Sequence, residues 1–300
     1  MINLLIERLK SLIAMDARED MALRSRTDFV RQFFPARAHL FRYADRPTGI
    51  HLVLRGVLCR YSMLPDGRRR ITAIHLPGDF VGVRSSFGLP LDHPVFALDC
   101  VETGFLPINC GDFAERMPLT CCALWLARET QLAILRQWLC NQSCSASTQV
   151  AHLLCELYVR LQALGLAQDG LANIPMTQIE LADALAMTPV HVNRVLRQMA
   201  RAGTATFIRS QLRILDWDRL VAIAQFDPAY LRTGSTLTWL ENLRAHPLGV
   251  ARVNGRGAGW SRAEELTRMH GAVATRPIGS PEERRPAPGR RLEHDGNWRP

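Results

Sequence analysis

Residues 176–200 of this chain, MTQIELADALAMTPVHVNRVLRQMA, constrain its fold more strongly than any other stretch. Thr177 precedes Glu180 by three residues, which is the spacing of a helix capping box. Thr188 followed by Pro189 is a second helix start, because a proline at the first helical position loses no backbone hydrogen bond. The stretch therefore predicts two short helices joined by a tight turn.

Both predicted helices have an apolar face. In the second helix the apolar residues recur at i, i+3, i+4 and i+7, which forms one buried stripe: Val192, Val195, Leu196 and Met199. In the first helix the residues expected to face inward are Ile179, Leu181, Ala182 and Leu185. The outward residues of the second helix are then Val190, His191, Arg194 and Arg197. Such a pair suits the DNA major groove, although an ordinary αα-hairpin has the same pattern.

Composition is that of a globular protein with a basic charge balance. The 300 residues allow about two domains, and the net charge of +9 is compatible with a polyanionic partner. Charged residues interrupt the apolar N-terminus, and no stretch is apolar for long enough to span a membrane. The eight cysteines have no regular framework, so we expect a cytoplasmic protein with reduced thiols.

The first half of the chain changes from a helical to a strand pattern. Residues 1 to about 34 are expected to form two helices, the second running through Phe34. From His39 to about Leu106 the apolar residues alternate with a period of two. HLVLRGVLCRYSML predicts a strand pair around Gly56, and 65–67 (PDG) a turn before the strand RRITAIHL. With two further strands in VFALDCVETGFLPI, the pattern predicts a small antiparallel barrel or jelly roll.

A long helix is expected next, because residues 119–141 contain neither proline nor glycine. Its apolar residues spread around more than one side, which requires two partners: its own barrel and a second subunit. An amphipathic helix after Ser143, the helix pair, two strands in ATFIRSQLRIL and a short helix near 217–226 then predict a winged helix-turn-helix.

These patterns together predict an α+β fold with five consecutive parts. They are an N-terminal helical segment (1–24), an antiparallel β-roll or jelly roll (25–117), a long dimerisation helix (118–142), a winged helix-turn-helix domain (146–230) and a basic, largely disordered tail (231–300) with a short helix at 261–270.

GIHLVLRGVL and LPGDFVG in the barrel, followed by the long helix and MTQIELADALAMTPVHVNRVLRQM, resemble the Crp–Fnr family of bacterial transcription regulators. The resemblance covers roughly residues 25–230, and the helix-turn-helix is its most specific part. It implies a homodimer paired through the long helix, with a sensory barrel and winged domains that bind palindromic double-stranded promoter DNA. It also implies contact with RNA polymerase.

The resemblance also assigns DNA-contacting roles within the helix pair. The base-reading positions are Pro189, Val190 and Arg194, with His191 and Asn193 beside them; the DNA-backbone candidates are Thr177, Gln178, Thr188, Arg197 and, in the wing, Arg209, Ser210 and Arg213. Arg194 is the strongest candidate, because a bidentate arginine–guanine contact contributes about 1–3 kcal/mol of discrimination. Val190 can touch a thymine methyl group, whereas the side chain of Pro189 makes no hydrogen bond.

One position departs from the family pattern. Ala186 stands in the turn where the family usually has glycine, at a position that tends to need a positive φ. An alanine in that conformation costs about 1 kcal/mol relative to glycine.

The family's ligands are not expected in this barrel. A gapless reading places Val83 and His93 where cyclic-nucleotide-binding members have a ribose-binding Glu and a phosphate-binding Arg, and Pro94 replaces the neighbouring hydroxyl. The ligand-contact positions of the long helix fall on Ile134 and Leu135. Because no arginine then meets the cyclic phosphate, cAMP is disfavoured.

No metal or other cofactor is expected either. An N-terminal iron–sulfur cluster is excluded because the first cysteine, Cys59, lies inside a strand, and His75, the nearest haem-ligand candidate, is interpreted as structural. Neither a zinc motif nor a catalytic constellation occurs, so an enzyme is disfavoured. The alternative kept open is a redox- or small-molecule-responsive sensor, with thiol candidates Cys121, Cys122, Cys140 and Cys144.

Overall fold

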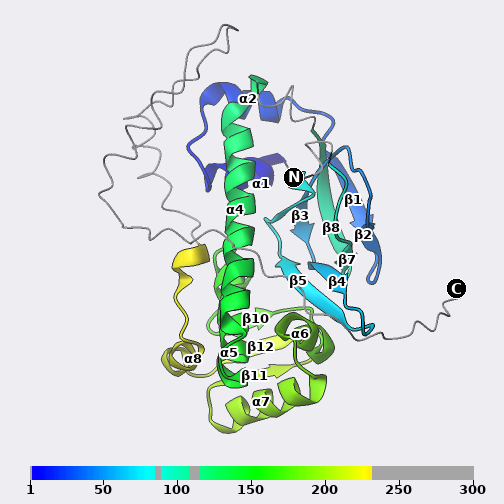
Figure 1. The fold of residues 1–300 in the computed structure, drawn as a ribbon. Coiled ribbons are helices and arrows are strands. Elements are labelled where there is room, and N and C mark those ends of the chain that lie inside the picture. The colour runs from blue at the N-terminus through cyan, green and yellow to red at the C-terminus, as the bar shows by residue number, and fades with distance from the viewer. Residues whose placement is uncertain (1, 85–88, 109–114, 232–300) are drawn as a thin grey trace, which may run out of the picture. The chain divides into compact units, whose positions relative to one another are not determined.

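The computed structural model describes residues 2–84, 89–108 and 115–231 (Figure 1). It has the predicted α+β architecture: an antiparallel β-roll, a long helix and a C-terminal helix-turn-helix domain with its own small sheet. Within the described ranges, no helix is long and apolar enough to cross a membrane. The predicted tail after Leu231 and its helix at 261–270 lie outside the described residues.

The N-terminal segment is helical over a shorter range than the sequence pattern indicates. It comprises α1 (Ile2–Lys10) and α2 (Ala17–Arg24), and Asp16 caps α2 by accepting the Glu19 N–H at 2.7 Å. The expected continuation of the second helix through Phe34 is wrong. Residues Val30–Phe34 form strand β1, rich in β-branched and aromatic residues, because this segment pairs with a strand some seventy residues later.

The β-roll consists of two four-stranded antiparallel sheets, with the orders β1-β8-β3-β6 and β2-β7-β4-β5. Its strands are β2 (His39–Phe41), β3 (Gly49–Arg55), β4 (Leu58–Met63), β5 (Arg69–His75), β6 (Phe80–Val81), β7 (Val95–Ala97) and β8 (Val101–Pro107). Apolar side chains from both sheets form one buried cluster that includes Phe41, Val53, Leu58 and Val95.

The predicted strand pair around Gly56 is wrong in its pairing. Both strands exist, but β3 belongs to one sheet and β4 to the other, so the chain changes sheet at Gly56. This glycine has φ +81°, and an added Cβ would lie 2.5 Å from the Cys100 carbonyl oxygen. By contrast, the predicted turn at 65–67 does join two paired strands, with Met63 opposite Arg69.

The long helix α4 (Pro118–Asn141) begins on a carboxylate from another helix. Its own N-cap residue, Met117, makes no side-chain cap. Glu19 of α2 instead accepts the backbone N–H groups of Leu119 and Thr120, each at 2.8 Å, and is only 2% exposed. A buried carboxylate at a helix N-terminus satisfies orphan amides and complements the helix dipole, so α2 fixes the start of α4.

The C-terminal part contains α5 (Ala146–Gln162), β9 (Ala167–Gln168), β10 (Leu171–Asn173), α6 (Gln178–Leu185), α7 (Pro189–Arg201), β11 (Ala205–Ile208), β12 (Gln211–Ile214), α8 (Trp217–Ala224) and the 3₁₀ turn η2 (Pro228–Leu231). Its sheet has the order β11-β12-β10-β9. Strands β9 and β10 were not anticipated, because segments of two and three residues are too short to show a periodic pattern.

Candidate nucleic-acid interface

Helices α6 and α7 begin at the predicted caps. Thr177 Oγ1 accepts the Glu180 N–H at 3.3 Å, while the Thr177 N–H donates to Glu180 Oε2 at 2.6 Å, which completes the capping box. Thr188 Oγ1 accepts the His191 N–H at 3.2 Å, and Pro189 is the first residue of α7. Both predicted helix starts are therefore confirmed.

The turn between the two helices contains the predicted left-handed residue. Ala186 has φ 55° and ψ 36°, in the left-handed region, where the Cβ of an L-residue lies too close to the following carbonyl oxygen. The Met187 N–H donates to the Ala182 carbonyl at 3.0 Å, which closes α6 before α7 begins. The prediction of a positive φ at Ala186 is confirmed.

The buried faces of the helix pair agree with the sequence pattern with one exception. The predicted stripe of α7, Val192, Val195, Leu196 and Met199, is buried. Ile179 of α6 was expected to face inward and is instead 58% exposed, so that expectation is wrong. Residues two apart on a helix are rotated by about 200°, so Ile179 faces nearly opposite to the fully buried Leu181.

The outer face of α7 presents exposed apolar and cationic groups. Val190 is 80% exposed, and Pro189, Arg194 and Arg197 are also exposed. No hydrogen bond or ion pair within the described part of the chain holds the side chain of Arg194 or Arg197. These guanidinium groups are available to a ligand on that face.

Two other predicted contact residues bind each other. Asn193 Nδ2 donates to Gln178 Oε1 at 2.6 Å, which connects the middle of α7 to the start of α6. Asn193, Gln178 and His191 are half-buried, whereas Thr177 and Thr188 are exposed. This bridge could not be predicted from the sequence, because residues 15 positions apart on different helices share no periodic signal.

The wing is a two-residue hairpin whose tip lies beside the start of α6. Arg209 and Ser210 both have positive φ (50° and 66°), as a hairpin turn of type I′ requires. The Ser210 carbonyl accepts the Ile174 N–H at 2.7 Å, and Ser210 Oγ donates to the Met176 carbonyl at 3.4 Å. Arg209 and the later wing residue Arg213 are exposed.

The acidic groups of α6 are turned to the β-roll and leave the α7 face cationic. Arg69 of β5 pairs with Asp183 at 2.7 Å, and Arg37 lies 3.3 Å from Glu180 Oε1. The arginines of α7 and the wing have no such carboxylate among the described residues. A surface of this kind, with a protruding helix and unpaired guanidinium groups, suits phosphate and guanine recognition.

The β-roll contains a small basic cavity where the family's nucleotide site would lie. Its volume is about 40 Å³, and Val83 and His93 both line it, as the gapless reading implies. The expectation that no arginine is present there is wrong: Arg60, Arg84 and Arg128 line the cavity. They come from β4, the segment after β6, and α4, so only the tertiary structure brings them together.

The cavity is small, and some of the charged groups at it are paired with one another. Asp92 pairs with Arg84 at 2.5 Å and also contacts His93. Burial and Arg60 lower the pKa of His93, so its imidazole is biased toward the neutral form. Ligand pockets are typically about 300–1,000 Å³, whereas this cavity has room for a few water molecules.

His75 is a buried residue of β5, and burial lowers its pKa to about 3. Gln131 Nε2 lies 3.4 Å from His75 Nδ1 and donates to the Phe80 carbonyl at 2.9 Å. No group of three or more His, Cys, Asp or Glu side chains that could hold a metal ion occurs in the described ranges.

Two family models match the chain. The model of the Crp-like helix-turn-helix domain matches residues 148–223, and that of the cyclic nucleotide-binding domain matches residues 31–109. Over 206 residues the chain is 31% identical to the nitrogen fixation regulation protein FixK of Bradyrhizobium diazoefficiens, covering 65% of this chain and 81% of FixK.

Further similarities agree with these matches. The transcriptional activatory protein AadR of Rhodopseudomonas palustris is 29% identical, with 62% of this chain and 77% of AadR covered. Among solved structures, FixK2 from Bradyrhizobium japonicum has the same fold, with a TM-score of 0.59 at 22% identity over 65% of this chain and 96% of that one. With these matches beside the helix-turn-helix geometry, the chain belongs to the Crp–Fnr family of bacterial transcription regulators and is a DNA-binding regulator, not an enzyme.

Proposed function

We propose that this regulator acts as a homodimer on palindromic double-stranded promoter sites, with α7 of each subunit in the major groove. The observation that carries this proposal is the exposed outer face of α7, where Val190 and Arg194 project without partners among the described side chains. Arg194 reads guanine and Val190 contacts a thymine methyl group. Pro189, His191 and Asn193 complete the base-reading positions, with Asn193 held by Gln178.

The remaining contacts are to the DNA backbone. The residues we assign to it are Thr177, Gln178, Thr188, Arg197, Arg209, Ser210 and Arg213. The hydrogen bonds from the wing tip to the segment before α6 support one continuous surface for the phosphates. RNA polymerase is the further partner expected once the dimer is on its promoter.

The proposed dimer interface is the uncovered face of α4. Trp125, Leu132 and Leu139 are 53%, 39% and 57% exposed, although all three are large apolar residues. They are spaced by seven residues, and half-buried Leu135 lies three positions after Leu132. The seven-residue spacing is that of one heptad position, so the three side chains form a single apolar stripe that a second copy of α4 covers.

We propose that cAMP, haem and an iron–sulfur cluster are not the effectors of this protein. The 40 Å³ cavity argues against a nucleotide, and the burial of His75 supports a structural role for that side chain. Thiol control remains the alternative, and exposed Cys122 and Cys140 are its accessible candidates. Burial raises the pKa of Cys59 and Cys155 to about 12, which argues against these two as reactive thiols.

Selection of the full-length protein against random double-stranded DNA tests the proposal. We expect enrichment of an inverted repeat with half-sites about one helical turn apart, and an affinity that falls steeply as salt rises. Binding without enrichment, together with insensitivity to salt, would contradict the proposal.

A further inference from the structure

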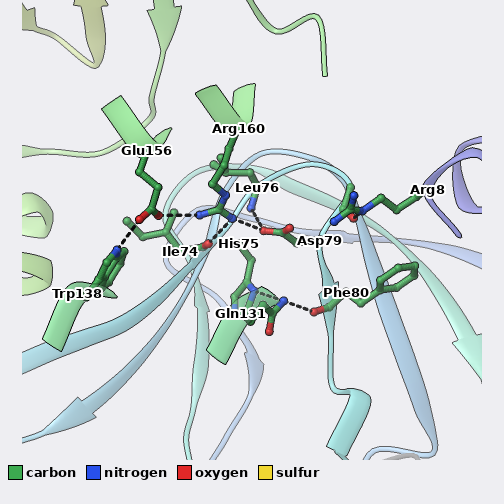
Figure 2. Close-up of polar contacts among 11 residues, drawn as sticks. Arg8, Ile74, His75, Leu76, Asp79, Phe80, Gln131, Trp138, Glu156 and Arg160 are labelled. Atoms are coloured by element: carbon green, nitrogen blue, oxygen red, sulfur yellow. Dashed lines mark hydrogen bonds and ion pairs between the residues drawn. The ribbon is translucent and has the colours of Figure 1, made fainter. Parts of the chain in front are cut away.

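A second and larger cavity lies outside the β-roll. Its volume is about 350 Å³, and it is lined by residues of α1, α4 and α5, by the 76–79 loop that joins β5 to β6, and by Phe80 of β6. Figure 2 shows Arg8 of α1 and Arg160 of α5 reaching this loop from different helices. The cavity thus lies where the N-terminal segment, the long helix and the first helix of the DNA-binding part meet.

Most of the cavity wall is apolar. The apolar lining includes Leu4, Leu76, Ile134, Val159, Ala163 and Leu164. The volume and the apolar lining with a few polar groups are those of a small-molecule site, and such sites are frequent where structural units meet. Ala163 and Leu164 are exposed, so this side of the cavity is open to solvent.

The polar end of the cavity has a guanidinium group, that of Arg8, which forms no ion pair with the described residues. Arg8 Nε donates to the Gly78 carbonyl at 2.9 Å, and Nη1 donates to Ser11 Oγ at 3.2 Å. No carboxylate of the described residues lies within 4.0 Å of the Arg8 guanidinium. Burial lowers the pKa of Arg8; the nearby Asp79 raises it, and Arg160 lowers it again. Because Arg8 forms no direct ion pair and is partly buried, a carboxylate bound against its guanidinium would add a charge-assisted hydrogen bond.

Neither acidic group on the cavity wall forms an ion pair with Arg8. Asp79 accepts from Arg160 Nη2 at 2.5 Å and from the Leu76 N–H at 2.9 Å. Glu7 also lines the cavity, but its side chain is exposed and makes no ion pair within the described ranges. The Arg8 guanidinium can therefore pair with the anionic group of a ligand.

The cavity wall is connected to the DNA-binding part by buried hydrogen bonds. Arg160 also binds Glu156 at 3.3 Å and donates to the Ile74 carbonyl at 3.0 Å. Glu156, which is fully buried, accepts from Trp138 Nε1 of α4 at 2.8 Å (Figure 2). Because Asp79 and Arg160 line the cavity, a ligand inside it lies against a network that spans the β-roll, α4 and α5.

We propose that this cavity binds a small monocarboxylic acid with an apolar body. The carboxylate pairs with Arg8, and the apolar body lies against Leu76, Ile134 and Val159. Binding bridges α1, α4 and α5 and favours one arrangement of the DNA-binding part. The role of this acid as an effector rests on the proposed function, whereas its binding to the cavity does not.

Calorimetry of the full-length protein without DNA, with octanoate and octanol as probes, tests the site. We expect one saturable octanoate site per chain and octanol binding weaker by about tenfold, because a charge-assisted pair is lost. Arg8→Gln should weaken octanoate by about tenfold and leave octanol unchanged. Ala163→Phe, at the exposed rim, should block both probes, and Arg18→Gln on the exposed face of α2 is the matched control.

Three results would overturn the proposal: no octanoate binding, equal affinity for octanoate and octanol, or full binding by Arg8→Gln. A fourth concerns the residues after Leu231, which itself lines the cavity. Trp239 lies eight residues after Leu231. If the Trp239→Ala variant of the full-length chain binds octanoate and the wild type does not, the segment after Leu231 fills the cavity, and the proposal is wrong. Each of these measurements is made without DNA, so a negative result does not contradict the promoter-binding proposal, which the DNA selection experiment tests separately.

Discussion

Asp183 Oδ2 of α6 accepts a hydrogen bond from Arg69 Nε of β5 at 2.8 Å and lies 2.7 Å from Arg69 Nη2 in the same ion pair. The Arg69 guanidinium also lies 5.4 Å from the centroid of the Phe96 ring, within cation–π range. The two side chains are 21% and 20% exposed, so the pair is shielded from solvent far more than a surface ion pair. It joins the β-roll to the first helix of the helix-turn-helix unit.

A double-mutant cycle of Arg69→Gln and Asp183→Asn should give a coupling free energy of about 1 kcal/mol in urea unfolding, because the ion pair is half-buried and hydrogen-bonded. The control is the same cycle on Arg68 and Asp66, which are 73% and 48% exposed and should couple weakly. Equal coupling in the two cycles would refute a special role for the buried pair.

Ala186→Gly should leave the melting temperature unchanged or raise it, with a gain of up to about 1 kcal/mol, because glycine adopts φ 55° without a Cβ clash. Ala184→Gly, in the body of α6, is the control and should cost about 1 kcal/mol or more. A clear loss of melting temperature in Ala186→Gly would contradict the strain assigned to the turn.

Arg194→Ala should reduce affinity for the selected DNA site by about 1–3 kcal/mol and relax the preference at one base pair. Arg197→Ala should weaken binding to all sequences alike and lower the salt dependence by about one phosphate contact. Fluorescence anisotropy at several salt concentrations separates the two effects. If both variants lose affinity uniformly, Arg194 is not a base-reading residue.

Leu132→Asp should convert the dimer to monomer in sedimentation velocity, because it places a carboxylate in the apolar seam of α4. Leu166→Asp is the matched control: Leu166 is 50% exposed and lies outside α4, so its charge should not change the sedimentation coefficient. Persistence of the dimer in Leu132→Asp would place the interface elsewhere.

Acid should destabilise the protein through its buried histidines. Burial lowers the pKa of His75 to about 3 and that of His51 to about 4, whereas an unfolded histidine titrates near 6.5. Below about pH 6.5 the unfolded chain binds more protons, so this stabilisation is complete above that pH and is lost as pH falls toward the folded values.

Between about pH 7 and about pH 5, each such histidine should lower the free energy of unfolding by up to about 2 kcal/mol. His75→Gln should therefore show a smaller loss over this range than the wild type, measured by urea unfolding at both pH values. Equal losses in the two proteins would show that His75 does not contribute to the acid sensitivity.

Several features of the candidate interface followed from the sequence because they depend on neighbouring residues. The caps at Thr177 and Thr188 involve partners three residues away, and the positive φ of Ala186 is a property of its own backbone. The α7 stripe arises from the 3.6-residue period alone. The prediction that Ile179 faces inward is wrong because residues two apart on a helix are rotated by about 200°, so Ile179 and the buried Leu181 cannot share a face.

Contacts between distant segments could not be predicted in this way. The change of sheet at Gly56, the pairing of β1 with β8 and the arginines around the 40 Å³ cavity depend on how separate elements pack. The same holds for Glu19 at the start of α4, one hundred residues away in the chain. No local sequence pattern predicts these pairings, because strand partners and buried ion pairs depend on how distant segments pack in the folded core.

The sequence by itself determined the α+β class, the family, the two helix starts and the strained turn at Ala186. Only the tertiary structure decided where the acidic groups of α6 are paired, since Arg69 and Arg37 of the β-roll form ion pairs with Asp183 and Glu180. It also placed Arg8 beside a cavity, with no carboxylate of the described residues within 4.0 Å of its guanidinium group. The physical reason is range: helix caps and φ angles act over a few residues, whereas ion pairing and burial act between segments joined only by folding.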